Sequence, residues 1–311
     1  WQDICNQMKN VKPLLSILVP TWNRCESIKK LIDSSGVQGN SNVEFVIVDN
    51  NSDDAIYQCL EDVSKNITNV RLYKNTQNIG MTRNWNKCIQ HSKGEWLLLI
   101  CSDDVFKAKR VVEILTFIKN NINTPSLILQ DESSVIPINK KQPGAKAVRS
   151  INLPIASGNI WHRSITEKLG GFDNRLEYSP DAEFWYRIAQ FYPIYIVNQN
   201  IAIYQRNDTS YMWKTWEKDD FINQIEIISR CNSRYGDPDI SDTDIRKNIK
   251  NGVWNTYMQI LGDTLATKRQ YIFNKYIFEA IKEVDSLTRF YELLTLLLKK
   301  AIINSLRWLL R

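Results

Sequence analysis

Two adjacent carboxylates, Asp103 and Asp104, follow the apolar run 96–100 and stand directly after Cys101 and Ser102. Neighbouring carboxylates at the end of a strand repel each other unless a cation or protons relieve the charge. Mg²⁺ and Mn²⁺ bind carboxylate oxygens and keep coordination positions free for phosphate. The pair therefore indicates a site for a divalent metal and a diphosphate, although a solvated turn or a helix N-cap explains two aspartates equally well.

Two further polar clusters, residues 20–24 and 49–53, each follow an apolar run in the same half of the chain. The first reads Pro-Thr-Trp-Asn-Arg and the second Asp-Asn-Asn-Ser-Asp. Ligands of open parallel α/β sheets bind where the carboxyl ends of the strands bring such loops together. Three polar clusters at three strand ends therefore predict one shared nucleotide site.

The elements that must position these clusters alternate in type. Short apolar runs predict strands at 14–19, 43–48, 70–73 and 96–100. Helix-like stretches lie between and after them, at 26–35, 53–66, 81–92 and 107–121. This alternation is typical of βαβ units, and strands that are apolar on both faces are covered by helices on both sides. The predicted fold class is α/β, with a mainly parallel sheet flanked by helices.

The composition shifts near residues 207–213. Before this point the pattern is mixed, with helices predicted at 163–169 and 181–191 and strands at 194–197 and 202–204. After it, helices alone are predicted, at 214–234, 242–266, 269–284 and 286–310. We therefore expect a nucleotide-binding domain at 1–212 and a helical C-terminal region at 213–311.

Bulk composition narrows the class of protein. The 311 residues are 43% hydrophobic and 24% charged, as in an ordinary globular chain. The net charge of +6 is mild and lacks the dense basic stripe of a nucleic-acid-binding protein, so no nucleic acid partner is expected. Six scattered cysteines without a CxxC pair predict mostly reduced thiols, which favours the cytosol. Two histidines exclude a multi-histidine metal site, and no apolar run reaches the roughly 18 residues of a membrane-spanning helix.

Five motifs in order, over residues 14–206, resemble the inverting glycosyltransferases of family 2, which have the GT-A fold. SILVPTWNR is similar to that family's first strand and PTYNR loop, and VEFVIVDNNSDD to its nucleotide-binding D(N/G)SxD loop. NIGMTRNWN resembles its N-x-G helix start, LLLICSDD its metal-binding DxDD strand, and GGFDNRLEYSPDAEFWYRIA its GGFDE and ED segments. The resemblance implies transfer of a sugar from a UDP- or dTDP-sugar to a saccharide, with Mn²⁺ or Mg²⁺ as cofactor.

The resemblance also implies roles for single residues. Asp104 would be the metal ligand, and Asp181 the general base that removes a proton from the acceptor hydroxyl. The residues expected to bind the nucleotide or the donor sugar are Pro20, Thr21, Asn23, Arg24, Asp49, Ser52, Arg83, Asn84, Ser102, Asp103, Asn159 and His162. Contacts with the acceptor or the diphosphate are expected from Trp161, Glu183, Trp185 and Arg206. Alternatively, Asp181 is a helix N-cap, His162 is structural, and the two tryptophans belong to the core.

Three departures from the family pattern bear on metal binding. Cys101 stands where the first Asp of DxDD lies, and Pro180 replaces the Glu of the ED pair. Residues 204–208, Tyr-Gln-Arg-Asn-Asp, lack the His that often completes the metal shell in the family. Asp208 or water would then complete it, and Arg206 would steady the diphosphate.

The last predicted helix is amphipathic. A helical wheel of residues 286–311 places on one face Leu287, Phe290, Tyr291, Leu294, Leu298, Ile302 and Leu309. Broadly opposite lie Arg289, Lys300, Arg307 and Arg311. Such a helix fits an anionic bilayer, but also a helix docked on the globular body or a dimer contact. With a lipid-linked saccharide as acceptor, it would hold a cytoplasmic enzyme on the cytoplasmic face of the bacterial inner membrane.

Two other classes of protein compete with a sugar transferase. A sugar nucleotidyltransferase has a similar sheet but needs a Gly-rich N-terminal loop, and residues 14–24 contain no glycine. A membrane-peripheral carbohydrate-binding or scaffold protein with a decayed site is favoured by Cys101, Pro180 and the missing His alone. Metal-dependent binding of UDP separates such a protein from an enzyme.

Overall fold

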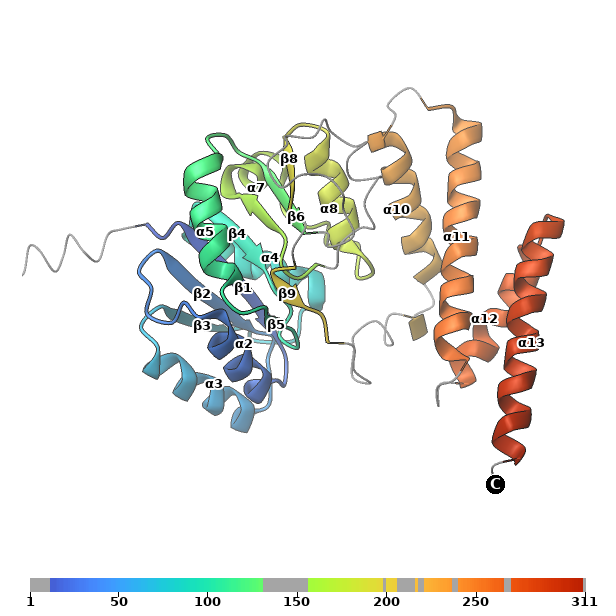
Figure 1. Ribbon diagram of the computed structural model, residues 1–311, viewed down its shortest axis with the longest axis horizontal. Helices are drawn as coiled ribbons and strands as arrows, with labels where there is room; N and C mark the ends of the chain where they lie inside the picture. Colours follow the sequence, from blue (N-terminus) through green and yellow to red (C-terminus); the bar gives the residue numbers. More distant parts are fainter. Residues whose placement is uncertain are drawn as a thin grey trace, which may run out of the picture. The chain divides into compact units, whose positions relative to one another are not determined.

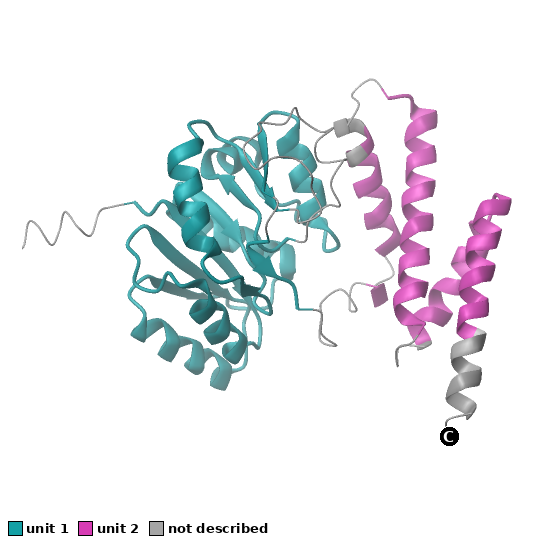
Figure 2. Ribbon diagram, viewed as in Figure 1, with its two compact units in different colours: residues 1–207 teal, residues 208–311 magenta. Residues whose placement is uncertain are grey.

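The computed structural model describes residues 12–130, 156–197, 200–205, 216–217, 221–236, 240–265 and 270–309. The chain divides into two compact units, residues 1–207 and 208–311 (Figure 2). The domain boundary that the sequence predicts, between 212 and 213, falls in the segment 206–215, which lies outside the described residues.

The described residues of the first unit form a seven-stranded sheet in the order β3-β2-β1-β4-β7-β6-β8 (Figure 1). The strands are β1 (Leu15–Thr21), β2 (Val43–Asp49), β3 (Val70–Lys74), β4 (Trp96–Leu99), β6 (Leu127–Gln130), β7 (Ile160–His162) and β8 (Ile194–Val197). β7 runs antiparallel to β4 and β6, and the other pairs are parallel. A separate ribbon pairs β5 (Val105–Phe106) with β9 (Ala202–Ile203). The predicted α/β class with a mainly parallel sheet is confirmed.

Helices cover both faces of this sheet. They are α2 (Cys25–Ser35), α3 (Asp54–Asn66), α4 (Met81–His91), α5 (Arg110–Asn121), α7 (Arg163–Leu169) and α8 (Pro180–Ala189). Side chains alternate along a strand, and one set, which includes Ile17 and Phe45, packs with α2, α3 and α5 in a continuous core. On the other face α4 packs against β1 and β2. The strands are apolar on both faces because both faces are covered.

β1 runs through Pro20 to Thr21 instead of ending before the proline. Its pairing with β4 stops at Leu18, whereas its pairing with β2 continues until Thr21 lies opposite Asp49. Pro20 therefore has a strand neighbour on one side only, and its missing N–H removes no bond from the ladder to β4. This register places Thr21 and Asp49 side by side at the carboxyl end of the sheet.

The second unit is helical, with α10 (Phe221–Gly236), α11 (Asp242–Thr264), α12 (Gln270–Lys282) and α13 (Leu287–Leu309). α11 packs against α10 and α12. α13 is fastened to α11 by Arg289, which donates to Asn251 over 2.9 Å, and by Glu292, which accepts from the Trp254 indole N–H over 2.7 Å. Among the described residues, no helix combines the length and the apolar character that a membrane span requires.

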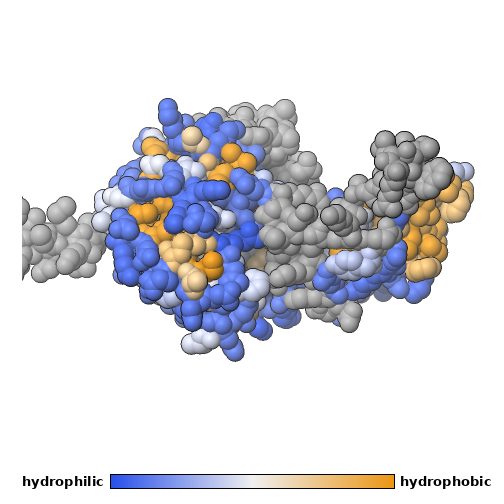
Figure 3. Space-filling model, turned by 90° about the horizontal axis from the view of Figure 1, so that it is seen from below, coloured by the Kyte–Doolittle hydropathy of each residue, from blue (hydrophilic) through white to orange (hydrophobic). Residues whose placement is uncertain are grey.

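The apolar face expected for α13 lies at the surface of the second unit. Its described members are 39–75% exposed and include Leu287, Phe290, Tyr291, Leu294 and Leu298. In Figure 3 apolar surface of this unit appears in orange. Arg289 lies on the opposite, buried face, where it is 8% exposed. Ile302, Arg307, Leu309 and Arg311 lie outside the residues whose side chains are described.

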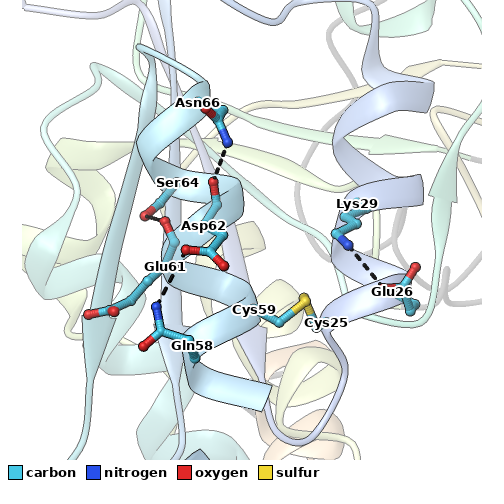
Figure 4. Close-up of a disulfide and its surroundings, with 9 residues drawn as sticks. All are labelled: Cys25, Glu26, Lys29, Gln58, Cys59, Glu61, Asp62, Ser64 and Asn66. Atoms are coloured by element: carbon cyan, nitrogen blue, oxygen red, sulfur yellow. Dashed lines mark hydrogen bonds and ion pairs between the residues drawn. A yellow bond between two sulfur atoms is a disulfide. The ribbon is translucent and has the colours of Figure 1, made fainter. Parts of the chain in front are cut away.

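A disulfide joins Cys25 of α2 to Cys59 of α3 (Figure 4). The expectation of reduced thiols is wrong for this pair, because the βαβ units bring together two helices whose cysteines are 34 residues apart. Cys88, Cys101 and Cys231 carry reduced thiols, and Cys5 lies outside the described residues. Since disulfides are rare in the reducing cytosol, cysteine usage no longer supports a cytosolic location.

Candidate functional site

Asp104 is held by donors from two distant segments of the chain. Its carboxylate is buried, with the residue 1% exposed. The Ser157 hydroxyl donates to Oδ2, and the Gln205 backbone N–H donates to Oδ1 over 2.9 Å. Ser157 Oγ also accepts from the Cys101 N–H over 2.8 Å, and the Asp104 N–H closes the turn onto the Cys101 carbonyl. The carboxylate therefore has a fixed place just beyond the end of β4.

Burial raises the pKa of Asp104 from 3.8 to about 6. The hydrogen bonds from Ser157 and Gln205 oppose this rise, the negative charge of Asp103 adds to it, and the positive charge of Arg24 opposes it. The hydrogen bonds and positive charges of the protein therefore do not fully offset the cost of burying the negative charge of Asp104. A bound cation would stabilise the ionised carboxylate.

The thiol of Cys101 connects this turn with Asp181. Burial raises the pKa of Cys101 well above 9.0, and the negative charges of Asp104, Asp103 and Asp181 raise it further. The charge of the predicted base, Asp181, therefore acts on the same thiol as the charges of the predicted metal-site pair.

Asp181 lies in the first turn of α8, directly after Pro180. The N-cap of this helix is Ser179, so the alternative interpretation of Asp181 as the N-cap is wrong. Burial raises the pKa of Asp181 from 3.8 to about 6, while hydrogen bonds from the N–H groups of Ala182 and of Asp181 itself partly oppose the rise. Such a carboxylate is ionised at neutral pH and binds a proton more readily than an ordinary aspartate, as a general base requires.

The loops that follow β1 and β2 are tied together at the same edge. The Asn23 N–H donates to Ser52 Oγ over 2.7 Å. Asp49 is fully buried and accepts from both the N–H and the hydroxyl of Ser52. The first loop also contacts the turn 101–104, since Arg24 Nη2 lies 3.6 Å from Asp103 Oδ2. The structure therefore brings the three polar clusters together.

Thr21 places an unused hydroxyl at this edge. The residue is 3% exposed, and within the described part of the chain its Oγ1 has no hydrogen-bond partner. Buried polar atoms in proteins are nearly always hydrogen-bonded, so an orphaned hydroxyl calls for an explanation. Pro20, also buried, precedes it at the end of β1. A ligand bound at the edge would supply the missing partner.

Helix α4 contributes two of the predicted residues in different ways. Asn84 is buried, and its side chain donates to the Val48 carbonyl over 3.0 Å and accepts from Asn75 over 2.8 Å. Arg83 is exposed. Gly80 precedes the helix with φ 85°, a conformation that favours glycine. Asn84 thus braces the end of β2, and Arg83 is accessible to an anionic ligand near the helix start.

His162 lies at the wrong end of the sheet for the predicted donor contact. Because β7 is antiparallel to β4, His162 pairs with Trp96 at the start of β4, whereas the turn 101–104 follows its end. The ring contacts Ser164 Oγ at 2.8 Å and Glu95 Oε1 at 3.4 Å, and it caps α7. The structural interpretation of this histidine therefore replaces the donor-binding one.

The two tryptophans expected near the acceptor are core residues. Trp161 and Trp185 are both 0% exposed and pack edge-on or tilted against Phe172 and Phe184. The Trp161 indole N–H donates to Thr166 over 2.7 Å. A sugar stacks on an accessible ring face, and neither ring offers one. The expectation that Trp161 and Trp185 contact the acceptor is therefore wrong, because both rings are buried.

Two other predicted residues have partners within the fold. Glu183 is 3% exposed and accepts two hydrogen bonds from the Arg187 guanidinium, over 2.8 and 2.9 Å. Asn159 is fully buried, and its side chain accepts from the Gln130 N–H over 3.2 Å. These contacts account for the burial of both polar side chains without a bound substrate. Arg206 lies outside the described residues.

Comparison with known proteins identifies the first unit. The model of the family "Glycosyl transferase family 2" matches residues 16–134, which contain all three polar clusters. Residues 16–134 form a family 2 glycosyltransferase domain. Over 110 residues the chain is 34% identical to an uncharacterized glycosyltransferase of Haemophilus influenzae, a stretch that covers 35% of this chain and 36% of the relative. The chain spans about a third of the length of the first two curated relatives that it matches.

Solved structures confirm the predicted fold of the chain. S. aureus TarS 1–349 in complex with UDP-GlcNAc superimposes with a TM-score of 0.61 at 18% identity, over 87% of this chain and 81% of that chain. The mannosyltransferase PcManGT from Pyrobaculum calidifontis, in complex with GDP-Man and Mn²⁺, gives 0.54 at 16% identity, over 92% and 80%. At such identities the likeness shows the fold alone, and that fold is GT-A-like.

The carboxylates of the family 2 domain suit a hard divalent cation that a diphosphate also holds. Asp104 is a buried, incompletely compensated carboxylate, and Asp103 stands beside it. Within the described residues, the one group of three metal-binding side chains closer than 4.8 Å is Cys25, Glu26 and Cys59, and its two sulfurs form the disulfide. Two aspartates leave most of a metal shell open, which Mg²⁺ and Mn²⁺ fill with phosphate oxygens and water.

Ser157, Gln205 and Gln130 surround Asp104 directly or through one contact, and none of them is predicted from the sequence. All three lie beyond residues 14–122, where alternating strands and helices predict the nucleotide site. A signal existed for one of them, because Ser157 and Gly158 precede a strand and small residues commonly allow close approach of backbone. Gln130 and the backbone of Gln205 carry no comparable signal in the sequence.

Proposed function

We propose that this chain is an inverting glycosyltransferase that moves a sugar from a UDP- or dTDP-sugar to a saccharide acceptor. The observation that carries the proposal is the buried Asp104 carboxylate, which Ser157 and Gln205 hold beside Asp103 just beyond the end of β4. This turn lies at the carboxyl end of a GT-A-like sheet, where α/β proteins bind their ligands, and the charge of Asp181 acts on Cys101 in the same turn. The adjacent pair suits a diphosphate with its metal, and the separate carboxylate suits a base.

In the proposed reaction Asp181 accepts the proton of an acceptor hydroxyl as that oxygen attacks C1 of the donor sugar. The bond between C1 and the diphosphate oxygen breaks, and its electron pair leaves with the nucleoside diphosphate. Attack on the face opposite the leaving group inverts the configuration at C1. Mn²⁺ or Mg²⁺, when bound, neutralises charge on the departing diphosphate, and Asp104 with Asp103 would hold it.

The donor side of the site uses the two loops and the start of α4. Thr21 offers its unpartnered hydroxyl, and Arg24 and Arg83 offer guanidinium groups, which suit phosphate. The side chain of Asp49 is occupied by Ser52 and keeps the second loop in shape. The donor-binding residues that we propose are Pro20, Thr21, Asn23, Arg24, Asp49, Ser52, Arg83, Ser102 and Asp103.

For the acceptor we propose a lipid-linked saccharide used in bacterial surface polysaccharide, with the enzyme on the cytoplasmic face of the inner membrane. Two observations support a membrane surface as partner. α13 exposes an apolar stripe from Leu287 to Leu298. In sequence, residues 286–311 contain four basic residues besides the buried Arg289, and one acidic residue, Glu292, which is bonded to Trp254. Apolar area together with basic charge favours anionic lipid.

Hydrolysis and transfer assays over a set of UDP- and dTDP-sugars, with Mn²⁺ or with EDTA, test the enzymatic proposal. Asp104→Asn and Asp181→Asn are each expected to abolish transfer in a folded protein, whereas Asp62→Asn on the surface of α3 should retain it. Full activity in both site variants would contradict the site. A wild-type chain that binds no nucleotide in calorimetry with Mn²⁺ would instead favour a carbohydrate-binding or scaffold protein.

A further inference from the structure

Gln130, at the end of β6, links both segments that donate hydrogen bonds to Asp104. Its Nε2 donates to the Ser157 carbonyl, and its Oε1 accepts from the N–H groups of Ile201, over 2.6 Å, and Ala202, over 3.3 Å. Ser157 bonds Oδ2 of Asp104. The strand β9 that begins at Ala202 leads within three residues to Gln205, which bonds Oδ1. One buried amide therefore fixes the two donors of one carboxylate.

The packing around this amide leaves little room for change. Gln130 is 3% exposed and Ser157 is 1% exposed. Gly158 has φ 91°, and a Cβ at this position would lie 2.5 Å from Gln130 Oε1. The Gln130 N–H also donates to Asn159, so the side chain and backbone of one residue hold the whole segment 157–159. Such contacts restrict the segment to one arrangement.

We propose that Gln130 and Ser157 are positioning residues that aim the Asp104 carboxylate at the metal and diphosphate. The proposal rests on the proposed function, because it gives Asp104 its task as metal ligand. A carboxylate that is already oriented loses less freedom when a metal binds, and groups that orient metal ligands affect metal affinity by about 10- to 100-fold. Ser157 does so directly, and Gln130 acts through Ser157 and the backbone before Gln205.

Calorimetric titration of UDP, and in parallel dTDP, with saturating Mn²⁺ or with EDTA tests the proposal. Ser157→Ala removes the hydroxyl between Cys101 and Asp104, and Gln130→Met removes the amide while keeping its length. Ser126→Ala is the matched control, since this fully buried serine donates to the Thr124 carbonyl away from Asp104. Thermal unfolding establishes that each variant is folded.

We expect Ser157→Ala and Gln130→Met to weaken Mn²⁺-dependent nucleotide binding by about 10-fold or more and to leave binding in EDTA unchanged. Ser126→Ala should match the wild type under both conditions. If a folded Ser157→Ala or Gln130→Met binds with wild-type affinity in Mn²⁺, or loses affinity equally in EDTA, the positioning role is wrong while the proposed function stands. If the wild type shows no Mn²⁺-dependent binding, the proposed function and this inference both fail.

Discussion

Replacing Asp181 by Asn removes a partly buried negative charge while nearly preserving the size of the side chain. Burial raises the pKa of Asp181 from 3.8 to about 6 in the folded chain. Each pKa unit corresponds to about 1.4 kcal/mol, so the ionised carboxylate destabilises the fold by about 3 kcal/mol relative to an ordinary aspartate. Part of the side chain reaches solvent. Screening there lowers the expected penalty to about 2 kcal/mol.

The pH dependence of this penalty has a defined sign. Below a pH of about 4 the carboxyl group is protonated in both the folded and the unfolded chain, and the penalty is absent. Between about pH 4 and pH 6 the unfolded chain releases its proton first, so the free energy of unfolding falls as the pH rises. Above about pH 6 both states are ionised, and the full penalty remains. Asn does not ionise and escapes it throughout.

Urea unfolding of the wild type and Asp181→Asn between about pH 4 and pH 8 measures the difference. The variant should be more stable by about 2 kcal/mol above pH 6, the two proteins should converge towards pH 4, and the variant should have lost transfer activity. The exposed control Asp62→Asn should change stability by less than about 0.5 kcal/mol. A variant no more stable than the wild type at neutral pH would refute the inference that Asp181 is a buried, destabilised base.

The same pKa predicts that kcat/KM of the wild type falls about tenfold per pH unit below about pH 6, because protonated Asp181 accepts no further proton; a flat profile would exclude this base. The free energy of unfolding of Cys25→Ser should be about 3–4 kcal/mol lower than that of the oxidised wild type, as expected for a disulfide that closes a loop of this length. The difference should vanish in reductant. Glu183→Gln should lower the free energy of unfolding by about 3 kcal/mol, because the Arg187 charge loses the opposite charge of Glu183. Nucleotide affinity should stay the same. His162→Ala should leave donor affinity unchanged in calorimetry, and a loss above tenfold would return this residue to the site.

The parallel half of the sheet could be predicted because each strand carries its own signal. The apolar runs that became β1, β2 and β4 are short and end at polar clusters, so both the strands and their functional edge could be inferred. The end of β1 was misplaced, because the effect of Pro20 depends on which side of the strand has a neighbour. That neighbour is set by strand order, which local sequence does not encode.

β7 shows where local patterns stop being informative. This strand has three residues, and its antiparallel direction follows from tertiary pairing with β4 and β6. This direction places Ser157, and not His162, near Asp104 and the turn 101–104. The disulfide between Cys25 and Cys59 depends in the same way on two helices meeting across one face of the sheet. The spacing of residues in the sequence predicts neither the direction of β7 nor this disulfide.

The arrangement of buried polar groups favours a donor-binding transferase over a carbohydrate-binding scaffold. The two tryptophans expected near the acceptor, Trp161 and Trp185, are fully buried and offer no ring face to a sugar. At the carboxyl end of the sheet, by contrast, Asp104 and Asp181 carry poorly compensated charges and Thr21 an unpartnered hydroxyl. Each of these groups lowers the stability of the ligand-free folded state. A ligand that neutralises the charges and bonds the hydroxyl binds the folded state selectively and stabilises it. A nucleotide diphosphate with Mn²⁺ should therefore raise the melting temperature, and should do so less in Asp104→Asn.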